Sequence, residues 1–441
     1  MTAPRIELSM IVKDGAATLA RCLASVRGAV DRIVIGDTGS TDNTIAIAKE
    51  FGAEVIAVPW QGDFSAARNA VLAHAKCDWI LSIDADEMLD QDGAHLLRQA
   101  IRTTSVAGFE AWRWNYVSRG DTRSGEQGAL PNPGKLKESQ AYPAYVRSLN
   151  TRLFRRNPEV RFERPVHETV AFSLKRLGLA VEAGSFIIHH LGHAEDSAAS
   201  RGRKNELYQQ IGLENLARNP SDVRTCFELG LGELEHFRRP EAALDYFLRA
   251  IQIDNRDGLS LLYAGVCLVR MRQFSEALRM LGYSAAIDAG SIVLHEAVGD
   301  AHFHLKNYPK ALQSYSEAQR LGSSSALIMA KRGVCEIYTG RKNGGMRRLR
   351  EALLCDPAFP ELYDLVATGA SLANENEYAA KVARRRLALA GATAFHFALA
   401  GVLLQLAGDP EQGKKIVAEG LTRFPNDPAL FTQWQEQSVS Q

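Results

Sequence analysis

A fixed interval of 34 residues in the second half of the chain is the feature that most restricts its fold. The repeated dipeptides and glycines that keep this interval are Ala243-Leu244, Ala277-Leu278, Ala311-Leu312, Gly265, Gly299 and Gly333. An interval of this size accommodates one pair of helices, and small residues recur where the two helices cross closely. The second half is therefore predicted to be a stack of helix pairs, each packed mainly on its neighbours.

These repeats resemble tetratricopeptide repeats, as in GDAHFHLKNYPKALQSYSEAQRLG, and AFHFALAGVLLQLAGDPEQGKKIVAEG looks like a degenerate copy. The array is expected from about Ser221 to Asp427, in a repeat domain of residues 221–441 that follows a helical connector at 201–220. The concave face of such arrays commonly binds extended peptide, which favours a peptide or protein partner. The repeats could also pair two copies of the chain, so a homodimer stays open.

The first two hundred residues follow a different pattern, in which short β-branched runs alternate with amphipathic helical stretches. The runs predicted to be strands are Glu7–Val12, Arg32–Gly36, Glu54–Val58 and Trp79–Ile83. Strict alternation of strand and helix predicts a parallel sheet with right-handed crossovers, whose ligands lie beyond the carboxyl ends of the strands.

The helices and loops around these strands are also predicted from local patterns. One helix carries Leu19, Leu23 and Val26 on a single face, and the next is preceded by Thr41 and Asp42, either of which can cap it. Residues 117–150 lack any sustained period, which is typical of a mobile functional loop or a disordered one. Regular structure is expected again from TRLFRR onward, followed by a helix over VHETVAFSLKRLG and a last strand over SFIIHH.

Composition excludes several classes of function. The 441 residues are 46% hydrophobic and 23% charged, with a formal net charge of +1, which gives no electrostatic reason to expect nucleic acid or an anionic membrane as partner. The six cysteines are scattered singly, as in proteins of a reducing compartment. Neither a signal peptide nor an integral membrane segment is recognised, so a cytoplasmic protein is expected.

Three segments in fixed order carry a second resemblance: IVIGDTGSTDNT, FSAARNAVLAHA and DWILSIDADE. Together they resemble family 2 glycosyltransferases of the GT-A fold. The resemblance covers residues 1–200 and implies a Rossmann-like α/β domain that binds a nucleotide-sugar, ahead of the all-α tetratricopeptide-type solenoid. It is closest to the subgroup with such repeats, which includes enzymes that glycosylate peptides and proteins. The implied reaction is an inverting, metal-dependent transfer of a hexose-type sugar from a UDP-linked donor.

Asp84 and Asp86 lie two residues apart at the end of a predicted strand, so their side chains point to the same face of the sheet. Two carboxylates in this arrangement suit a divalent cation, Mn²⁺ or Mg²⁺, which would neutralise the charge that develops on a departing nucleoside diphosphate. The resemblance implies that Asp84 faces the ribose and that Asp86 binds the metal. A capped strand end with solvated acids is the alternative.

The turn after the second strand supplies further candidates for the nucleotide. The resemblance implies that Asp37 accepts a hydrogen bond from the base and that Arg68 packs near the base or the phosphates. The DTGST segment also has good turn and helix-capping chemistry, which is the alternative. Related enzymes usually carry Asn-Glu where this chain has Asp14 and Gly15; Asp14 could still reach the nucleotide.

An inverting displacement needs one general base near the acceptor. Glu168, in the segment RPVHETV, stands where related enzymes carry an acidic base, and His167 beside it is the rival. Glu168 is expected to open a helix, so stabilisation of the helix N-terminus through the dipole is the alternative role.

Three histidines follow the last predicted strand: His189, His190 and His193. His190 best fits the histidine that completes the metal site in many GT-A enzymes, although neighbouring histidines are otherwise often surface or core residues. Arg201, Arg203 and Lys204 could clamp a diphosphate, or could simply begin a solvated helix.

Two other functions remain open at this point. One is a glycosyltransferase for cell-envelope glycans. The other is a protein-interaction scaffold whose transferase domain has lost activity. The first indication of such a loss would be Gly15, which stands where related enzymes usually carry glutamate. The run GDTGS is not GxGxxG and no GxxxxGK[ST] occurs, which disfavours dinucleotide and P-loop sites.

Overall fold

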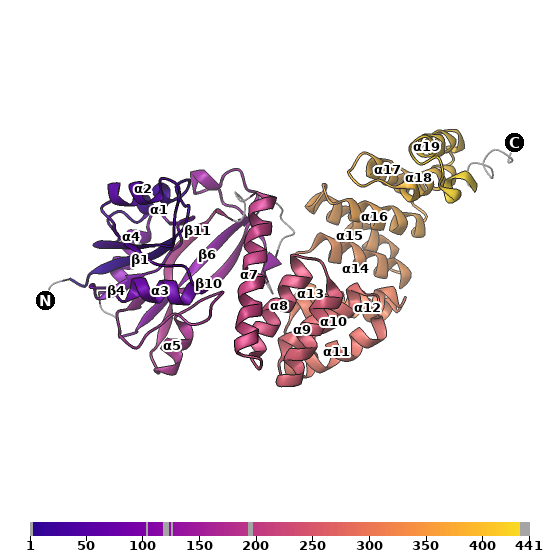
Figure 1. Ribbon diagram of the computed structural model, residues 1–441. Coiled ribbons are helices and arrows are strands. Elements are labelled where there is room, and N and C mark those ends of the chain that lie inside the picture. Colours follow the sequence, from indigo (N-terminus) through magenta and orange to yellow (C-terminus); the bar gives the residue numbers. More distant parts are fainter. Residues whose placement is uncertain (1–2, 103–104, 118–122, 125–126, 193–196, 433–441) are drawn as a thin grey trace. The chain divides into compact units, whose positions relative to one another are not determined.

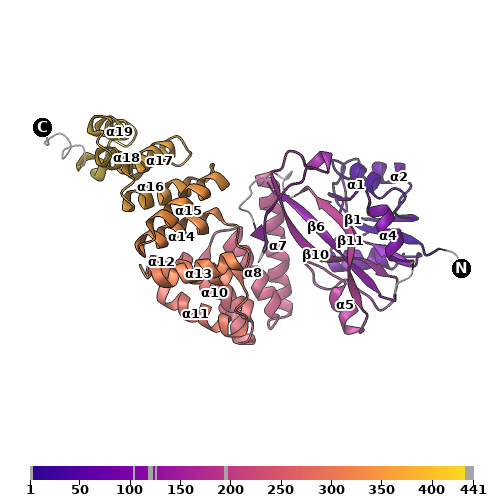
Figure 2. The same ribbon diagram turned by 180° about the vertical axis from the view of Figure 1, so that it is seen from behind.

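The computed structural model describes residues 3–102, 105–117, 123–124, 127–192 and 197–432 of the chain. Its contacts divide the protein into two units, Met1–Asn255 and Arg256–Gln441 (Figure 1). The first unit combines a mixed sheet with helices, and the second is helical throughout its described residues (Figure 2).

The strands of the first unit form one large sheet and one small separate pair. The large sheet contains β1 (Ile6–Val12), β2 (Arg32–Asp37), β3 (Glu54–Ala57), β4 (Trp79–Leu81), β5 (Glu87–Leu89), β6 (Gly108–Val117), β9 (Leu130–Pro131), β10 (Ala144–Arg155) and β11 (Val181–His190). Its strand order is β3-β2-β1-β4-β10-β6-β11-β5, with β9 beside β10. The strands β7 (Arg123–Ser124) and β8 (Gln127–Gly128) form the small pair.

The predicted parallel arrangement is confirmed for β1 to β4, whose pairings with one another are all parallel. It does not extend further, because β10 runs antiparallel to both β4 and β6 and makes the sheet mixed. The prediction of irregular structure up to residue 150 is wrong from residue 144 onward. Those residues belong to β10, whose long ladder with β6 supplies the backbone partners that the local sequence pattern does not reveal.

Helices cover both faces of this sheet. The first unit contains α1 (Leu19–Ser25), α2 (Thr44–Glu50), α3 (Phe64–Leu72), α4 (Gly93–Ala100), α5 (Ala171–Arg176), α7 (Ala198–Arg218), α8 (Val223–Glu235) and α9 (Pro240–Ile253). One core joins α1, α2 and α4 to alternate residues of β1, such as Leu8 and Met10. On the other face, α3 packs on Val34, and α5 packs with Ile80 and Phe154. The predicted apolar face of α1 is confirmed, since its three residues are buried.

The second unit is built from consecutive antiparallel helix pairs. Its helices are α10 (Gly258–Arg270), α11 (Phe274–Ile287), α12 (Ile292–His304), α13 (Tyr308–Arg320), α14 (Ala326–Tyr338), α15 (Lys342–Cys355), α16 (Pro360–Leu372), α17 (Asn376–Leu387), α18 (Ala394–Leu406) and α19 (Pro410–Arg423). The repeating glycines lie at the helix crossings: a β-carbon at Gly299 would come within 2.5 Å of the Tyr315 ring. The predicted helical-repeat solenoid is confirmed.

The helix pair α8–α9 already carries the repeating Ala243-Leu244 dipeptide, although its contacts assign it to the first unit. The segment expected to be a connector is the long helix α7, and it belongs to the first unit as well. The domain boundaries at residues 200 and 220 stay a prediction.

Candidate active site

Three of the candidate carboxylates follow neighbouring parallel strands. Val12 at the end of β1 pairs with Asp37 at the end of β2, and β4 pairs with β1 on its other side. Asp14 lies two residues after the end of β1, and Asp84 lies three residues after the end of β4. The sheet therefore brings Asp14, Asp37 and Asp84 to the edge where open α/β sheets bind their ligands.

The turn after β2 ties Asp37 to Asp14. The Asp37 carboxylate accepts hydrogen bonds from the backbone N–H groups of Gly39 at 3.2 Å and Ser40 at 3.1 Å. The Asp14 carboxylate accepts from the Thr41 N–H at 2.7 Å, and the Asp14 N–H donates to the Ser40 hydroxyl at 2.9 Å. Because each carboxylate has about four lone-pair sites, both keep acceptor capacity for a ligand.

Gly15, where related enzymes usually carry glutamate, is closely packed. Its N–H donates to the Thr44 hydroxyl at 2.8 Å. A β-carbon added at Gly15 would lie only 2.7 Å from a methyl group of Val12, a buried residue of β1. Close packing against Val12 therefore explains why glycine stands at this position, without any loss of activity.

Arg68, on α3, joins two carboxylates that are distant in sequence. Its Nη2 donates to Asp84 Oδ1 at 2.5 Å and its Nε donates to Glu168 Oε1 at 2.6 Å. The guanidinium group also lies 5.5 Å from the centre of the Phe162 ring. The Arg68 side chain is only 8% exposed, so its charge is compensated by these two carboxylates rather than by water. The two ion pairs fix the positions of Asp84 and Glu168 relative to each other.

Hydrogen bonds hold the turn that carries Glu168 against the first turn of α3. The Phe64 N–H donates to the Pro165 carbonyl at 2.9 Å, and the Ser65 hydroxyl donates to the Arg164 carbonyl. Arg164 also forms an ion pair of 3.5 Å with Glu228 of α8. These contacts explain how a loop residue is held in reach of the sheet edge.

The prediction that Glu168 opens a helix is wrong. Helix α5 begins at Ala171, and Glu168 lies in the turn before it. His167 has a φ of 54°, and Glu163 pairs with Thr169 across the turn, so the backbone cannot become helical here. A role at the helix N-terminus therefore loses its basis, and the Glu168 carboxylate binds Arg68 instead.

A second arginine fixes the turn of the DADE segment, and sequence reasoning missed it. Arg152 donates to the fully buried Glu87 carboxylate at 2.7 Å and lies 3.5 Å from Asp84 Oδ2. The Glu87 carboxylate accepts the Asp84 N–H at 2.8 Å. Arg152 is the extra residue of a bulge in β10, between Thr151 and Leu153. A bulge redirects a side chain without leaving any signal in a hydrophobic pattern.

Asp86 lies outside this arginine network and faces a histidine. Its Oδ2 is 3.3 Å from His190 Nε2, at the end of β11, and its side chain is 30% exposed. The chain passes so close at Gly192 that a β-carbon there would lie 2.2 Å from the same oxygen. His190 Nδ1 makes a second hydrogen bond, of 2.8 Å, to Asn115 Oδ1 on β6.

The other two histidines differ from His190. His189 is 2% exposed, and its ring nitrogens contact the Tyr116 hydroxyl at 2.9 Å and Asp90 Oδ1 at 3.0 Å. Both nitrogens are thus engaged by the protein. His193 lies outside the described residues.

Helix α7 adds a basic and an aromatic side chain beside the Glu168 turn. The Tyr208 ring contacts the rings of Phe64 and His167, with 5.8 Å between centroids in each case. Lys204 Nζ lies 5.9 Å from the Tyr208 ring centre, and Arg201 lies in the first turn of the same helix. Sequence reasoning singled out both cations but not Tyr208, which follows Lys204 by one helical turn.

Asp84 and Asp86 differ in the charges that surround them. Burial acts to raise the pKa of Asp84, but the charges of Arg68 and Arg152 hold it well below its ordinary value. Burial likewise acts to raise the pKa of Asp86, but the hydrogen bond and charge of His190 hold it below normal. Both carboxylates are therefore ionised at neutral pH, and only Asp84 has its charge balanced by arginine.

The donor set around Asp86 fits a divalent cation that is shared with a ligand. Within the described residues no three carboxylate, imidazole or thiol groups gather closely enough to hold a metal ion by themselves. Asp86 and His190 instead supply one oxygen and one nitrogen that face each other. Mg²⁺ usually takes one or two protein carboxylates and completes its coordination with phosphates and water.

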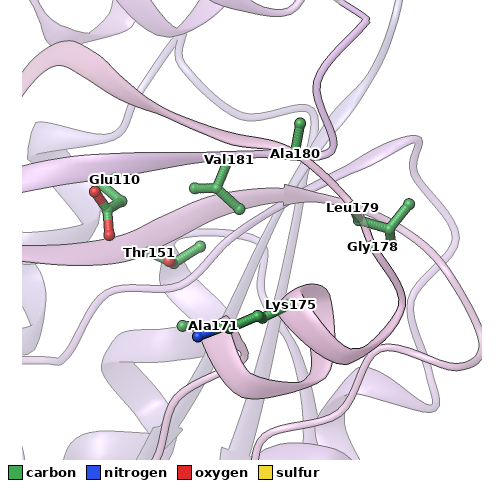
Figure 3. Close-up of a pocket in the computed structure, with 8 residues that line it drawn as sticks. All are labelled: Glu110, Thr151, Ala171, Lys175, Gly178, Leu179, Ala180 and Val181. Atoms are coloured by element: carbon green, nitrogen blue, oxygen red, sulfur yellow. The ribbon is translucent and has the colours of Figure 1, made fainter.

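A cavity elsewhere in the unit has none of these residues in its wall. It lies between α5 and the strands β10, β6 and β11, and Figure 3 shows the residues that line it. Its lining is formed by Glu110, Thr151, Ala171, Lys175, Gly178, Leu179, Ala180 and Val181. The candidate site is defined by its side-chain network rather than by this cavity.

The first unit is thus a mixed α/β domain with carboxylates gathered at its strand ends, and helical repeats follow it in the chain. Residues 9–159 match the family Glycosyl transferase family 2. The match runs from β1 to just beyond β10, so it includes Asp84 and Asp86 and ends before Glu168.

Curated proteins of two kinds are similar to parts of the chain. The chain is 37% identical over 234 residues to a TPR repeat-containing protein of Synechococcus elongatus, with 51% of each chain covered. It is 26% identical over 256 residues to the SPbeta prophage-derived glycosyltransferase SunS of Bacillus subtilis, covering 56% of this chain and 53% of SunS. The chain thus spans about half the length of these relatives. An uncharacterized glycosyltransferase of Rickettsia felis is 42% identical over 90 residues, covering 20% of this chain and 31% of its own.

Among solved structures, the chain is similar to the APC/C hetero-tetramer Cut9–Hcn1. The sequence identity is 16% and the TM-score 0.46, with 54% of this chain and 46% of that chain covered. In the described part of the protein, no helix combines the length and apolar character needed to cross a membrane.

Proposed function

We propose that the protein is an inverting, metal-dependent glycosyltransferase that moves a hexose-type sugar from a UDP-linked donor to a peptide or protein. The observation that carries this proposal is the different surroundings of two neighbouring carboxylates. Asp84 is balanced by two arginines, whereas Asp86 makes its ion pair with an imidazole and is also influenced by the charge of Lys204. Such an edge offers one acceptor for ligand hydroxyls and one ionised ligand for a cation.

The nucleotide would lie along the ends of β1, β2 and β4. Asp37 and Asp14 would accept hydrogen bonds from the base, and Asp84 would accept from a ribose hydroxyl. Arg201 and Lys204 of α7 would approach the diphosphate, whose charge suits both side chains. Arg68 orients Asp84 rather than the nucleotide itself, because its guanidinium already binds two carboxylates.

Asp86 and His190 would hold Mn²⁺ or Mg²⁺ together with the donor phosphates. When bound, such a cation neutralises the negative charge that grows on the departing diphosphate. Asp86 is the better placed of the two aspartates, because no arginine competes for its charge in the described contacts.

Glu168 would act as the general base. The acceptor oxygen forms a bond to the anomeric carbon while the bond to the diphosphate breaks, and the acceptor proton passes to the Glu168 carboxylate. The leaving diphosphate keeps the electron pair, and the configuration inverts. Arg68 contributes by holding the Glu168 and Asp84 carboxylates at one guanidinium, which fixes the base relative to the donor site.

The acceptor would be selected partly by the helical repeats. Stacked helix pairs create an extended surface, and such surfaces commonly bind extended peptide. A net charge of +1 gives no comparable argument for nucleic acid.

A thermal-shift panel of nucleotide-sugars, with and without Mn²⁺, tests the proposal. A donor-binding enzyme is stabilised by ligand through mass action, and the shift should be larger with metal. An inactive scaffold would show no metal-dependent shift with any donor, and that outcome would reject the proposal. Transfer to a cell-envelope glycan instead of a peptide would reject only the acceptor class.

A further inference from the structure

The amide of Asn115 has only one orientation that satisfies its neighbours. Its Nδ2 lies 3.2 Å from the Val146 carbonyl oxygen and 3.3 Å from the Ser148 hydroxyl, both on the paired strand β10. A carbonyl oxygen can only accept, so the NH₂ group must face β10. The Asn115 Oδ1 atom consequently faces His190, 2.8 Å from its Nδ1.

This orientation determines where the imidazole of His190 carries its proton. Because Asn115 Oδ1 can only accept, the Nδ1 atom of His190 must be the donor. When both ring nitrogens are protonated, Nε2 donates to Asp86 Oδ2 at 3.3 Å, but the neutral ring carries its lone pair on Nε2. In the neutral ring, Nε2 and Asp86 Oδ2 are two acceptors that face each other, and they repel unless a cation lies between or beside them.

We propose that Asn115 is a positioning residue that holds His190 in its Nδ1–H form, so that Nε2 and Asp86 together present two lone pairs to a divalent cation. This inference rests on the proposed function. Outer partners of this kind fix the ring and tautomer of histidine ligands, and their loss typically lowers metal affinity by about 10- to 100-fold.

The sheet makes this arrangement rigid. Asn115 on β6 pairs with His190 on the parallel strand β11 and with Val146 on the antiparallel strand β10. The amide therefore spans two ladders of the sheet rather than a loop. Asn150, on β10, donates to the same Ser148 hydroxyl at 3.2 Å, and no hydrogen bond between it and His190 appears among the described contacts. It provides a matched control.

The test compares the full-length protein with its Asn115→Leu, Asn115→Asp and Asn150→Leu variants. Mn²⁺ affinity is measured by electron paramagnetic resonance without donor and with UDP. The His190 tautomer is read from ¹⁵N chemical shifts in the metal-free protein, at a pH where the ring is neutral. We expect Asn115→Leu to weaken Mn²⁺ binding by about 10-fold or more and to lose the single Nδ1–H form. Asn115→Asp keeps an oxygen acceptor and should bind Mn²⁺ more tightly than Asn115→Leu. Asn150→Leu should stay within about twofold of the unsubstituted protein.

Each other outcome has a defined meaning. A folded Asn115→Leu variant with unchanged Mn²⁺ affinity would overturn the role of Asn115 and leave the proposed function standing. If Asn115→Leu does not fold, equal weakening by Asn115→Asp and Asn150→Leu would overturn it instead. Failure of the unsubstituted protein to bind Mn²⁺, even with UDP, would overturn the metal-dependent function itself and this inference with it.

Discussion

The Nε atom of Arg68 donates a hydrogen bond of 2.6 Å to Glu168, a residue one hundred positions later in the chain. The same guanidinium reaches Asp84 through Nη2. The buried Arg68 guanidinium thus links the proposed base to the proposed donor site. It is expected to contribute both to the stability of the domain and to its chemistry.

Replacing Arg68 by methionine should destabilise the first unit by about 3 kcal/mol, because removal of one partner leaves buried carboxylates uncompensated. The measurement is urea unfolding followed by circular dichroism. Arg176→Met is the control, since the ion pair of Arg176 with Glu163 is largely exposed and should contribute less than about 1 kcal/mol. Equal losses in both variants would contradict the special position of Arg68.

Acid should weaken the folded protein through Asp84. Burial acts to raise the pKa of this carboxyl, but Arg68 and Arg152 hold it well below its ordinary value. A lowered pKa means that the stabilisation is fully present above the unfolded-state pKa of about 3.9 and is lost as the pH falls below it toward the folded-state pKa. The unsubstituted protein should therefore lose stability more steeply below pH about 4 than the Asp84→Asn variant. Parallel curves for the two proteins would show that Asp84 contributes nothing.

Glu168→Gln should lower turnover by about 10²- to 10⁴-fold with little change in donor affinity, because a general base acts in the transition state rather than in nucleotide binding. Turnover and donor affinity are measured separately, by initial rates and by calorimetry. His167→Ala is the comparison. A larger loss of turnover in the histidine variant than in the glutamine variant would transfer the role of base to His167.

Asp86→Asn should abolish sugar transfer and leave the fold intact, since it removes the charge that attracts the cation but keeps the shape of the side chain. Asp84→Asn should also reduce transfer. Rates are measured at saturating Mn²⁺, with folding checked by circular dichroism. Near-normal turnover of Asp86→Asn under these conditions would show that the metal site has been assigned to the wrong residue.

The sequence predicted the parts of the structure that repeat or alternate. The four parallel strands follow from short β-branched runs that alternate with helical stretches, and the helix pairs follow from the 34-residue period. The order of motifs singled out Asp84 and Asp86. Contacts made across the sheet were not predicted. Arg152 reaches Glu87 only because of a bulge, and Asn115 meets His190 only because β6 and β11 pair in one register. Neither fact leaves a local signal in the chain.

The last prediction concerns how much of the chain the donor site needs. Every proposed donor ligand precedes Arg218, but the contacts of the first unit continue to Asn255. Glu228 of α8 pairs with Arg164, and Leu216 of α7 packs with Leu229 in one apolar cluster. A chain ending at Arg218 loses these partners, whereas a chain ending at Asn255 keeps them.

We therefore expect the chain that ends at Asn255 to bind the nucleotide-sugar and hydrolyse it slowly, yet to fail to modify its acceptor. Repeat units contact mainly their neighbours, so removal of α10 to α19 opens one junction and leaves the sheet and its core intact. The shorter chain ending at Arg218 should bind the same donor but unfold at lower urea concentration.

Donor hydrolysis and acceptor glycosylation are measured side by side on the full-length and truncated proteins, with folding checked by circular dichroism. Equal acceptor glycosylation by the full-length protein and the chain ending at Asn255 would exclude the repeats from acceptor selection. Loss of donor binding in a truncated chain that remains folded would instead mean that the repeats complete the nucleotide site.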